Sequence, residues 1–500
     1  MRGEKDLQSR SLSGRLKFLL KDSVLYGGAM ALSKMLAIFV VPILTRIFST
    51  QEYGSIDGIA VCAAVFGPFI MMGQDSAIAR YFYEADDETA RRQVVSQAFV
   101  LETILALTVC TILWLQAEAL MGWFLGIPAY ADLFRVAVLT IPFWVLIQFT
   151  QNLLKWTFQK TQFLTVSLGS TVAVVFFTLL YVLVFEAGIK GVFYAQLTGL
   201  GLFSVLGLFF SRSYMAWPEG YRYILPLLKF GWPYMLIGVC GSLLPSMDRY
   251  FISNYLSLQT LGLYAIGYKV ASLIQLPLSG FQIAWGPFAY ALYKDKDTVC
   301  KTYDTALFSW TLIATISACM LIAMGPLLTY IFASERYLAG HVVILPLTFS
   351  FMLGSLSGVT GIGLDLSKKT HWAALSYALS VIFGALAIGL FIGRFGLLGV
   401  AYGAFVGQLT LATAKTFFAY RSSPIRFDLF RPAGLFFIAF VLAYTLEYLS
   451  FLSWSYQTGI YGLLFLSLLA IIWKGFMRKD ERQGVVKCIE TFWKRSSSKN

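Results

Sequence analysis

Three lysine residues, Lys34, Lys269 and Lys415, lie inside runs of mostly apolar residues that are long enough to cross a bilayer as helices. A charged side chain near the middle of such a helix costs about 2.5–3.5 kcal/mol on insertion scales, so it usually faces protein or water rather than lipid. Lys34 is the clearest case, because it lies in the middle of the first run, Asp22 to Phe48. We predict that Lys34 is a charge in a water-filled cavity, and the alternative is a buried structural ion pair.

Other charged side chains near the ends of the apolar runs are also candidates for a binding site. Arg249 follows Asp248, so these two residues could belong to a site or form an ion pair at the membrane boundary. Arg80 precedes Tyr81 and Phe82, where an arginine more often fixes the topology. The candidate cations are therefore Lys34, Arg249, Lys269 and Arg80. The candidate carboxylates for ion coupling are Asp248, Asp75, Glu102 and Asp365, and each of them also has a structural explanation.

The sequence holds little of what catalysis or metal binding requires. It has two histidines, His341 and His371, and six cysteines without a C-x-x-C pair. It has no P-loop, no dinucleotide fingerprint and no nucleophile elbow. We therefore predict no catalytic residues, no metal site, no disulfide bonds and no cofactor, and we exclude an ATP-driven pump contained in one chain.

Composition predicts the structural class that must position these side chains. Hydrophobic residues make up 58% of the 500 residues and charged residues 13%, whereas an ordinary soluble domain has about 25% charged residues. The mean hydropathy of +0.70 and the recurring long apolar runs indicate an all-α, polytopic membrane protein. Residues 1–21 are basic, but the run that follows is too long for a signal peptide, so we expect it to remain as the first span.

About fourteen membrane-spanning helices are predicted from the apolar runs. The predicted spans are 22–48, 55–77, 94–116, 134–156, 163–185, 191–210, 230–252, 261–281, 303–324, 342–364, 372–391, 396–420, 435–452 and 459–473. With the N-terminus placed in the cytoplasm, 30 of the 39 lysine and arginine residues fall on the cytoplasmic side, so both termini are predicted to be cytoplasmic. Topology then explains most of the net charge of +13 without nucleic acid as a partner, and some of this charge could attract anionic lipid headgroups.

Two parts of the sequence resemble each other at a nearly constant offset. At an offset of 208 residues, the matching positions are Gly188–Tyr194 with Gly396–Tyr402, Gly199 with Gly407, and Gly54 with Gly262. At an offset of 209 residues, Lys160-Thr161 matches Lys369-Thr370. Because each repeat would hold six spans, an even number, the two copies should share one orientation about an axis along the membrane normal.

The repeat predicts two pseudo-symmetric six-helix lobes around a central cavity, with two C-terminal helices appended. The predicted boundaries are 1–21 for a cytoplasmic N-terminal segment, 22–212 for the N-lobe, 213–421 for the C-lobe, 422–476 for the last two spans and 477–500 for a basic cytoplasmic tail. The tail is expected to form either a surface helix with one apolar face or a solvated segment.

Several short motifs resemble those of one exporter family. The segment Thr45–Gly54 is similar to the family's "R-h-h-x-x-x-x-Y-G" turn, and Gly73–Phe82 is similar to its "G-x-x-x-A-x-x-R-Y-F" motif. The segments similar to the start of its second repeat are Asp248–Ile252, Gly262–Lys269 and Ala284–Phe288. In order and spacing over the first twelve spans, the chain resembles the polysaccharide biosynthesis, or Wzx-type oligosaccharide flippase, family of the multidrug/oligosaccharidyl-lipid/polysaccharide exporter superfamily.

This resemblance implies a flippase of the bacterial cytoplasmic membrane. Such a protein would move polyprenyl-pyrophosphate-linked oligosaccharide from the cytoplasmic to the outer leaflet by alternating access. The implied partners are this substrate and membrane lipids, with a polysaccharide polymerase and other assembly proteins as candidates. A pyrophosphate needs cations and an isoprenoid tail needs a route along lipid, so Lys34, Arg249 and Lys269 are the expected substrate contacts.

Two other functions remain open. An ion-coupled multidrug exporter of the same superfamily would be expected to have twelve spans and buried carboxylates for cationic drugs, whereas the clear mid-span charges here are lysines. A membrane polysaccharide polymerase or acyltransferase would need a catalytic constellation. The longest predicted outer loops, 117–133 and 325–341, carry few reactive groups.

Overall fold

The computed structural model describes residues 27–29, 31–292, 299–448, 467, 470–477 and 482. Every regular element in this part of the chain is a helix, as the sequence predicts. The α-helices are α3 (Val41–Ile47), α4 (Thr50–Ala64), α5 (Gly67–Met71), α6 (Gln74–Glu84), α7 (Glu88–Leu115), α8 (Ala117–Leu125), α9 (Ala131–Trp156), α10 (Lys160–Leu179), α11 (Gly188–Ser211), α12 (Ile224–Tyr255), α13 (Leu258–Ser272), α14 (Gln275–Leu292), α15 (Val299–Ala323), α16 (Gly325–Phe332), α17 (Ile344–Thr360), α18 (Ile362–Leu366), α19 (Thr370–Ser422) and α20 (Phe430–Tyr448). The N-terminal segment 1–21 and nearly all of the predicted tail lie outside the described residues.

Contacts divide the chain into two units. The first comprises Met1–Asp295 and Gly325–Ile425, and it contains all candidate site residues. The second comprises Lys296–Met324 and Arg426–Asn500. The lobe boundaries expected from the sequence rest on the repeat rather than on contacts, and they stay a prediction.

The second unit contains α15 and α20, which pack against each other. The guanidinium group of Arg431 lies 4.1 Å from the ring centre of Phe308 and donates to the carbonyl of Phe476. The carboxylate of Asp304 accepts a hydrogen bond from the amide of Asp428 (2.8 Å). These contacts hold the start of α20 against α15.

Ten helices in the described residues are long and apolar enough to cross a membrane, and the bent pair Leu258–Ser272 and Gln275–Tyr290 makes an eleventh candidate. The chain is therefore a multi-pass membrane protein. Helix α19 is one of the ten, yet its 53 residues would extend about 80 Å, against a hydrocarbon thickness of about 30 Å. Its backbone is non-helical at Gly396, where the sequence places the boundary between two spans. Because the last predicted span lies largely outside the described residues, the number fourteen stays a prediction.

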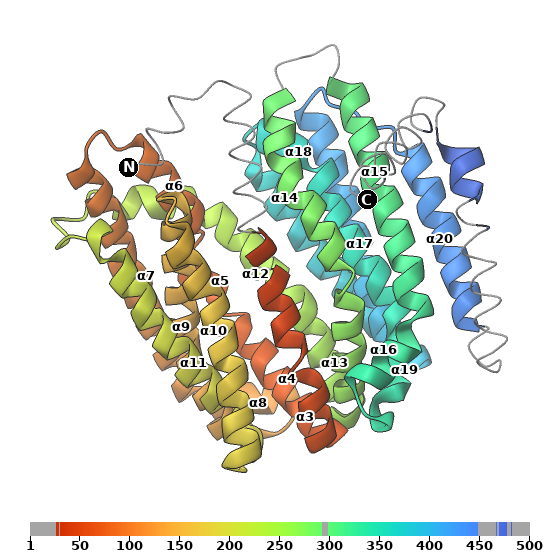
Figure 1. Cartoon of the computed structure of the whole chain (residues 1–500), viewed down its shortest axis with the longest axis horizontal. Coiled ribbons are helices and arrows are strands. Elements are labelled where there is room, and N and C mark those ends of the chain that lie inside the picture. The colour runs from red at the N-terminus through yellow and green to blue at the C-terminus, as the bar shows by residue number, and fades with distance from the viewer. Residues whose placement is uncertain are drawn as a thin grey trace, which may run out of the picture. The chain divides into compact units, whose positions relative to one another are not determined.

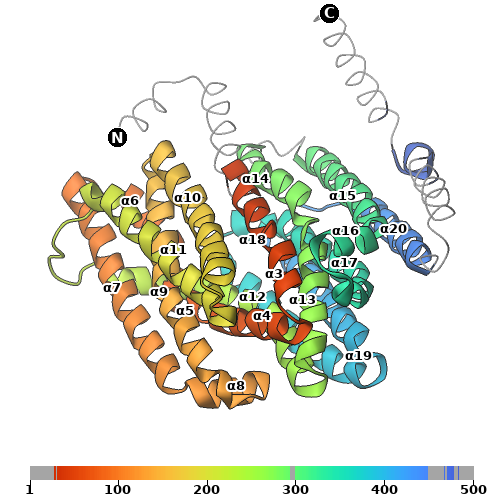
Figure 2. The ribbon, with the colours of Figure 1, turned by 60° about the horizontal axis from the view of Figure 1, so that its bottom comes forward.

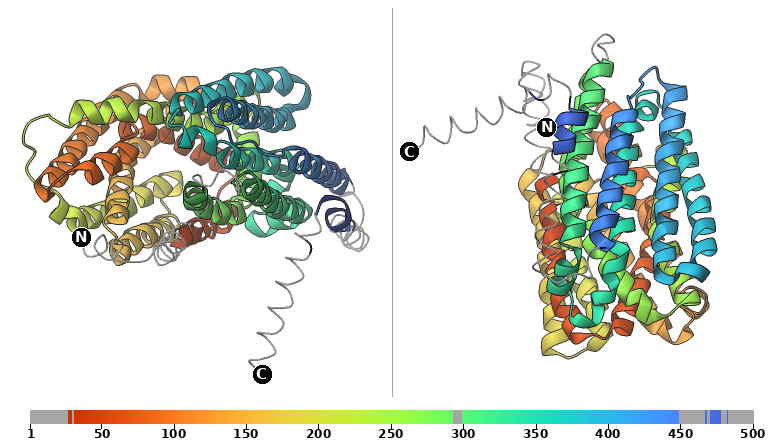
Figure 3. Two further views of the ribbon diagram at one scale, coloured as in Figure 1. Left: turned by 90° about the horizontal axis from the view of Figure 1, so that it is seen from above. Right: turned by 90° about the vertical axis from the view of Figure 1, so that its right-hand side faces the viewer.

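The long helices of the first unit run alongside one another, and the view from above shows many of them tilted (Figure 3). We name the two ends of this bundle by their connections. The Phe48 end, at the bottom of Figure 1, holds the turn from α3 to α4 and the helix α8. The Glu84 end, at the top of the same view, holds the end of α6 and the helix α18.

A capping box fixes the turn at the Phe48 end. The hydroxyl of Ser49 accepts a hydrogen bond from the amide of Glu52 (3.3 Å), and the carboxylate of Glu52 accepts one from the amide of Ser49 (2.8 Å). This cap makes α4 begin at Thr50, five residues earlier than the predicted second span. The residues that α4 gains include Tyr53 and Gly54, both of which belong to the candidate site.

Equal backbone conformations at related positions confirm the predicted repeat. Gly188 and Gly396 both have positive φ angles, 57° and 54°, in a region that glycine adopts readily. Phe158 and Lys368 each lie two residues before the start of α10 or α19, and they share positive φ angles, 59° and 57°. They are 210 positions apart (368 − 158), one more than the sequence match in this region gives. In both turns the next residue donates its amide to the carbonyl five residues earlier (2.8 and 3.0 Å). The connections between equivalent helices therefore have the same backbone conformation in the two repeats.

Candidate functional site

Helices α4 and α13 are equivalent in the two repeats, since both their first and last residues are 208 positions apart (258 − 50 and 272 − 64). They cross in backbone contact at the Phe48 end, where Figure 2 shows them side by side. A Cβ atom on Gly54 would overlap the carbonyl oxygen of Leu258, and a Cβ atom on Gly262 would overlap that of Thr50. The two repeat-related glycines therefore meet each other, and only glycine permits so close an approach.

A buried ion pair joins α4 to α12 beside this crossing. The guanidinium Nε of Arg249 donates to the carboxylate of Asp57 at 3.0 Å, with the two side chains 2% and 10% exposed. The same guanidinium lies 4.2 Å from the ring centre of Tyr268. Removing either partner of a buried ion pair leaves an uncompensated charge in the protein interior. This pair therefore couples the two helices strongly.

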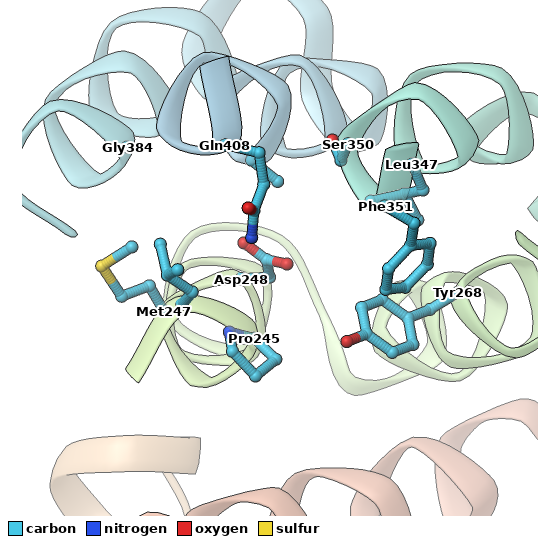
Figure 4. A pocket seen from close by; sticks show the side chains of 11 residues that line it. Pro245, Met247, Asp248, Tyr268, Leu347, Ser350, Phe351, Gly384 and Gln408 are labelled. Carbon is cyan, nitrogen blue, oxygen red and sulfur yellow. The ribbon is translucent and has the colours of Figure 1, made fainter. Parts of the chain in front are cut away.

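The neighbouring carboxylate of Asp248 has one satisfied and one free oxygen. Its Oδ2 accepts a hydrogen bond from the hydroxyl of Tyr264 (2.6 Å), while its buried Oδ1 has no hydrogen-bond partner among the described residues. Asp248, Ser350 and Gln408 line a cavity of about 40 Å³. Figure 4 shows the side-chain amide of Gln408 pointing toward the Asp248 carboxylate. The cavity has room for one water molecule or a small cation.

A chain of aromatic contacts holds the ammonium group of Lys269. Lys269 donates to the hydroxyl of Tyr53, and its nitrogen lies 4.7 Å from the centre of that ring. The ring of Tyr53 meets Tyr337 edge to face at 5.8 Å, and the hydroxyl of Tyr337 donates to the carbonyl of Phe48 (3.0 Å). Lys269 is therefore tied to the Phe48 end through α4.

These residues form one structural feature, which we call the inter-repeat contact. It consists of Tyr53, Gly54, Asp57, Arg249, Gly262 and Lys269. Two of the four candidate cations, Arg249 and Lys269, belong to it. In this structure both of them are engaged with α4 rather than facing open solvent.

Lys34 lies apart from the inter-repeat contact, in the first span (Gly27–Ile47). Its side chain is exposed, and its nitrogen donates to the side-chain carbonyl of Gln275 at 3.5 Å. Gln275 begins α14, just after the 44° bend that separates α14 from α13. In the part of the chain that the structure describes, no carboxylate pairs with Lys34, and Gln275 is its hydrogen-bond partner.

A second glycine pair brings the repeats together nearer the Glu84 end. Met72 and Gly73 have positive φ angles of 47° and 65°, and they break the helix between α5 and α6. A Cβ atom on Gly73 would overlap the carbonyl of Gly231 on α12, and one on Gly231 would overlap the carbonyl of Met72. Helix α12 therefore packs directly against this break.

The remaining sequence candidates are spread over the first unit. Arg80 forms an exposed ion pair with Glu84 (2.8 Å) and lies over the ring of Phe230 (4.8 Å). Glu102 is buried in α7, Asp75 lies in the first turn of α6, and Asp365 is exposed on α18. No ion pair to these three carboxylates occurs among the described residues.

Sequence reasoning missed Asp57 and Tyr53. Asp57 lies near the beginning of the second predicted span, 55–77, so it was not counted among the charges inside the membrane. The available signal was that it is an acidic residue within α4, whose other residues are mostly small or apolar. The role of Tyr53 depends on a contact 216 residues away, which no local pattern shows.

The chain matches the family described as "Polysaccharide biosynthesis protein" over residues 43–340, more than half of its length. The chain belongs to this family. The matched region includes the whole inter-repeat contact and ends within the connection between α16 and α17. Membership confirms the resemblance that the sequence motifs indicate.

Two proteins of Haemophilus influenzae are similar in sequence. Lsg locus protein 1 is 25% identical over 323 residues, which cover 63% of this chain and 77% of the relative. A membrane protein of the same organism is 23% identical over 332 residues, covering 64% of this chain and 75% of the relative. Both relatives therefore align with the family member over most of their length.

Solved structures show the fold of the family member. The lipid II flippase MurJ in its inward closed conformation superposes with a TM-score of 0.72 at 15% identity, covering 91% of this chain and all of MurJ. An inward-facing multidrug resistance MATE transporter superposes with a TM-score of 0.65 at 14% identity, covering 83% and 95% of the two chains. At these identities the likeness establishes the fold alone, and it confirms the predicted fold class.

Proposed function

We propose that this protein is a flippase for polyprenyl-pyrophosphate-linked oligosaccharides, in the bacterial cytoplasmic membrane. Its Phe48 end would face outward and its Glu84 end the cytoplasm, as the distribution of basic residues predicts. Membership of a polysaccharide biosynthesis family and the shared fold of MurJ support this proposal. Lipid-linked substrate and membrane lipids would be its partners, together with a polymerase and other assembly proteins.

The inter-repeat contact is the observation that carries the proposal. Alternating access requires two halves that close on each other at one face and can separate there. Gly54 and Gly262 let the backbones of α4 and α13 touch, so the two halves pack tightly at this end. Two polar interactions, Arg249 with Asp57 and Lys269 with Tyr53, fix how the halves align. Opening the Phe48 end would break these interactions and expose both cations to a passing pyrophosphate.

Lys34 would meet the substrate first. The first span and α14 meet at the weak Lys34–Gln275 hydrogen bond, so few polar interactions would have to break for these helices to separate. A pyrophosphate could then replace Gln275 as the partner of the ammonium group, while the isoprenoid tail remains in lipid beside the first span. Arg80, on the Glu84-end surface, would serve at the cytoplasmic mouth.

Ion coupling would use a carboxylate that changes its partner as the halves move. Asp248 suits this role best, because it lies beside Arg249 (3.9 Å) and has one free oxygen. When Arg249 leaves Asp57, Asp248 is the nearest carboxylate to receive it. Asp75, Glu102 and Asp365 remain candidates on the basis of the sequence alone.

Deletion of the gene tests the proposal. We expect the deletion strain to make lipid-linked oligosaccharide but to retain it on the cytoplasmic leaflet, where an enzyme added to everted vesicles can modify the sugar. A strain that makes no lipid-linked oligosaccharide would instead point to a biosynthetic enzyme. Unchanged surface polysaccharide with increased sensitivity to cationic drugs would point to a drug exporter.

A further inference from the structure

The segment that joins the two repeats is fixed along α7. Three side chains on one face of that helix, Gln93, Ser96 and Gln97, hold its backbone. The bonds run from the Ala216 amide to Ser96 (2.8 Å), from Gln93 to the Trp217 carbonyl (2.9 Å), from the Glu219 amide to Gln93 (2.8 Å), from Gln97 to the Glu219 carbonyl (3.2 Å) and from the Tyr223 amide to Gln97 (2.8 Å). The connection therefore belongs to the same folded body as α7.

One side of this segment is packed inward. Tyr214, Met215 and Tyr223 contact a buried apolar cluster formed by α6, α7, α9 and α12. The hydroxyl of Tyr214 also accepts a hydrogen bond from Gln159 (3.0 Å). Both the backbone and these three side chains are therefore engaged, so the other side chains of the segment start from a fixed backbone.

Two large aromatic side chains of the same segment are almost fully exposed. Trp217 is 87% exposed and Tyr221 is 83% exposed, which places them among the most exposed large hydrophobic residues of the described chain. The exposed charged residues from position 212 to 229 are Arg212, Glu219, Arg222 and Lys229, with a net charge of +2 (3 − 1). We call Trp217, Tyr221, Arg212 and Arg222 the linker surface.

The linker surface lies close to the membrane boundary. It lies where the span Gly188–Tyr214 connects to the span Ile224–Tyr255, and only nine residues (215–223) separate these two spans. Tryptophan and tyrosine combine an apolar ring with a polar edge and are enriched at the membrane–water boundary. Arginine near that boundary is attracted to anionic headgroups.

We propose that the linker surface binds the anionic headgroup layer of the membrane at the Glu84 end. Trp217 and Tyr221 enter the boundary between headgroups and acyl chains, and Arg212 and Arg222 pair with lipid phosphates. Gln93, Ser96 and Gln97 are positioning residues, since they hold the anchors at a fixed height relative to α7. This inference depends on the membrane-spanning helices and not on the identity of the transported substrate.

Spin labels on single cysteines test the proposal. In the full chain with its six cysteines replaced by alanine, labels are placed at Trp217→Cys and Tyr221→Cys and the protein is reconstituted in vesicles. The vesicles are phosphatidylcholine alone or a mixture with phosphatidylglycerol. The measurement is the ratio of collision rates with oxygen, which concentrates in lipid, and with a water-soluble nickel chelate. Asp86→Cys, in an exposed turn, calibrates water, and Leu202→Cys, exposed in the middle of α11, calibrates lipid.

We expect both labels to give ratios between the two calibration positions, and to give higher ratios when phosphatidylglycerol is present. In the variant with Gln93→Ala and Gln97→Ala, the labels should become more mobile and their ratios should move toward the Asp86 value. Ratios equal to that of Asp86 in both lipids would overturn the proposal and favour a soluble partner protein. Ratios insensitive to phosphatidylglycerol would overturn the role of anionic headgroups.

Discussion

Lys34 is the residue whose chemistry the sequence makes most visible, and the structure defines how to test it. It is exposed, and it donates a 3.5 Å hydrogen bond to Gln275. Its replacement should therefore leave folding unchanged, unlike the loss of one partner from a buried ion pair.

We expect Lys34→Ala to reduce export strongly at normal protein abundance. Lys34→Arg should retain part of the activity, since the charge persists but the compact ammonium becomes a planar fork. Lys34→Glu should be worse than alanine, because it places a negative charge against an anionic substrate. Surface polysaccharide and membrane abundance are measured together, with Gln275→Ala as the matched variant. Normal export by Lys34→Ala at normal abundance would refute a substrate-binding role.

Arg249 and Asp57 should behave as a coupled pair. Because both are buried, Arg249→Ala or Asp57→Ala alone should destabilise the protein by about 3–5 kcal/mol. The double variant should be more stable than the sum of the single effects predicts, since neither Arg249 nor Asp57 is then left without the other. Thermal unfolding of the purified protein in detergent measures these changes. The exposed pair Arg80 and Glu84 serves as the control, for which we expect about 0–1 kcal/mol.

At the scale of helices, the crossing of α4 and α13 should tolerate no added methyl group. Gly54→Ala and Gly262→Ala each force a Cβ atom against backbone, so the Phe48 end should be pushed toward its open state. A cysteine at Ala265, which is fully buried in α13, reports this through labelling by an impermeant maleimide added outside. We expect faster labelling in both variants.

Gly393→Ala provides the matched control for this experiment, because no described atom beyond its own stretch of α19 lies within 4 Å of its Cβ position. It should leave the labelling rate of the Ala265 cysteine unchanged and stabilise α19 by about 0.8–1 kcal/mol, since alanine has the higher helix propensity. Equal labelling of the Gly54→Ala variant and the unmodified protein would mean that the crossing does not control access from that face.

The helices themselves were largely predictable, because a bilayer imposes a minimum apolar length on each of them. What the sequence pattern missed were the ends and the breaks. Helix α4 begins earlier than expected because a side-chain cap at Ser49 satisfies its first amides. The break at Met72 could not be predicted, since a non-glycine residue adopts positive φ there against the packed backbone of Gly231.

At the scale of the whole molecule, the repeat could be predicted from the sequence, but the contact between its two halves could not. A constant offset between glycines identifies equivalent helices, but it says nothing about which pairs of helices touch. The ion pair between Arg249 and Asp57 joins residues 192 positions apart in the sequence, beside the crossing of α4 and α13. The sequence could therefore name Arg249 and Lys269 as candidates without showing that α4 holds them.

Topology is the prediction that belongs to the whole chain. Reporter fusions after Lys229 and after Arg431 should give cytoplasmic signals, and fusions near Glu335 should give an outer-side signal. Ser334, next to Glu335, donates to the carbonyl of Thr45 at the Phe48 end, so a fusion near Glu335 reports the side of the membrane that this end faces. A C-terminus found outside the cytoplasm would mean an odd number of spans, with the error at the last two.

The meeting of Gly54 with Gly262 has a consequence for how such a protein arose. If the two repeats, which share one orientation, arose from a single half, that half would have paired with a second copy of itself. In a symmetric dimer, a residue beside the two-fold axis touches its own counterpart. In that dimer Gly54 and Gly262 would have been one residue facing itself, and Thr50 and Leu258 one residue whose carbonyl abutted the glycine of the opposite copy. A side chain gained at the glycine position would then have clashed twice at once.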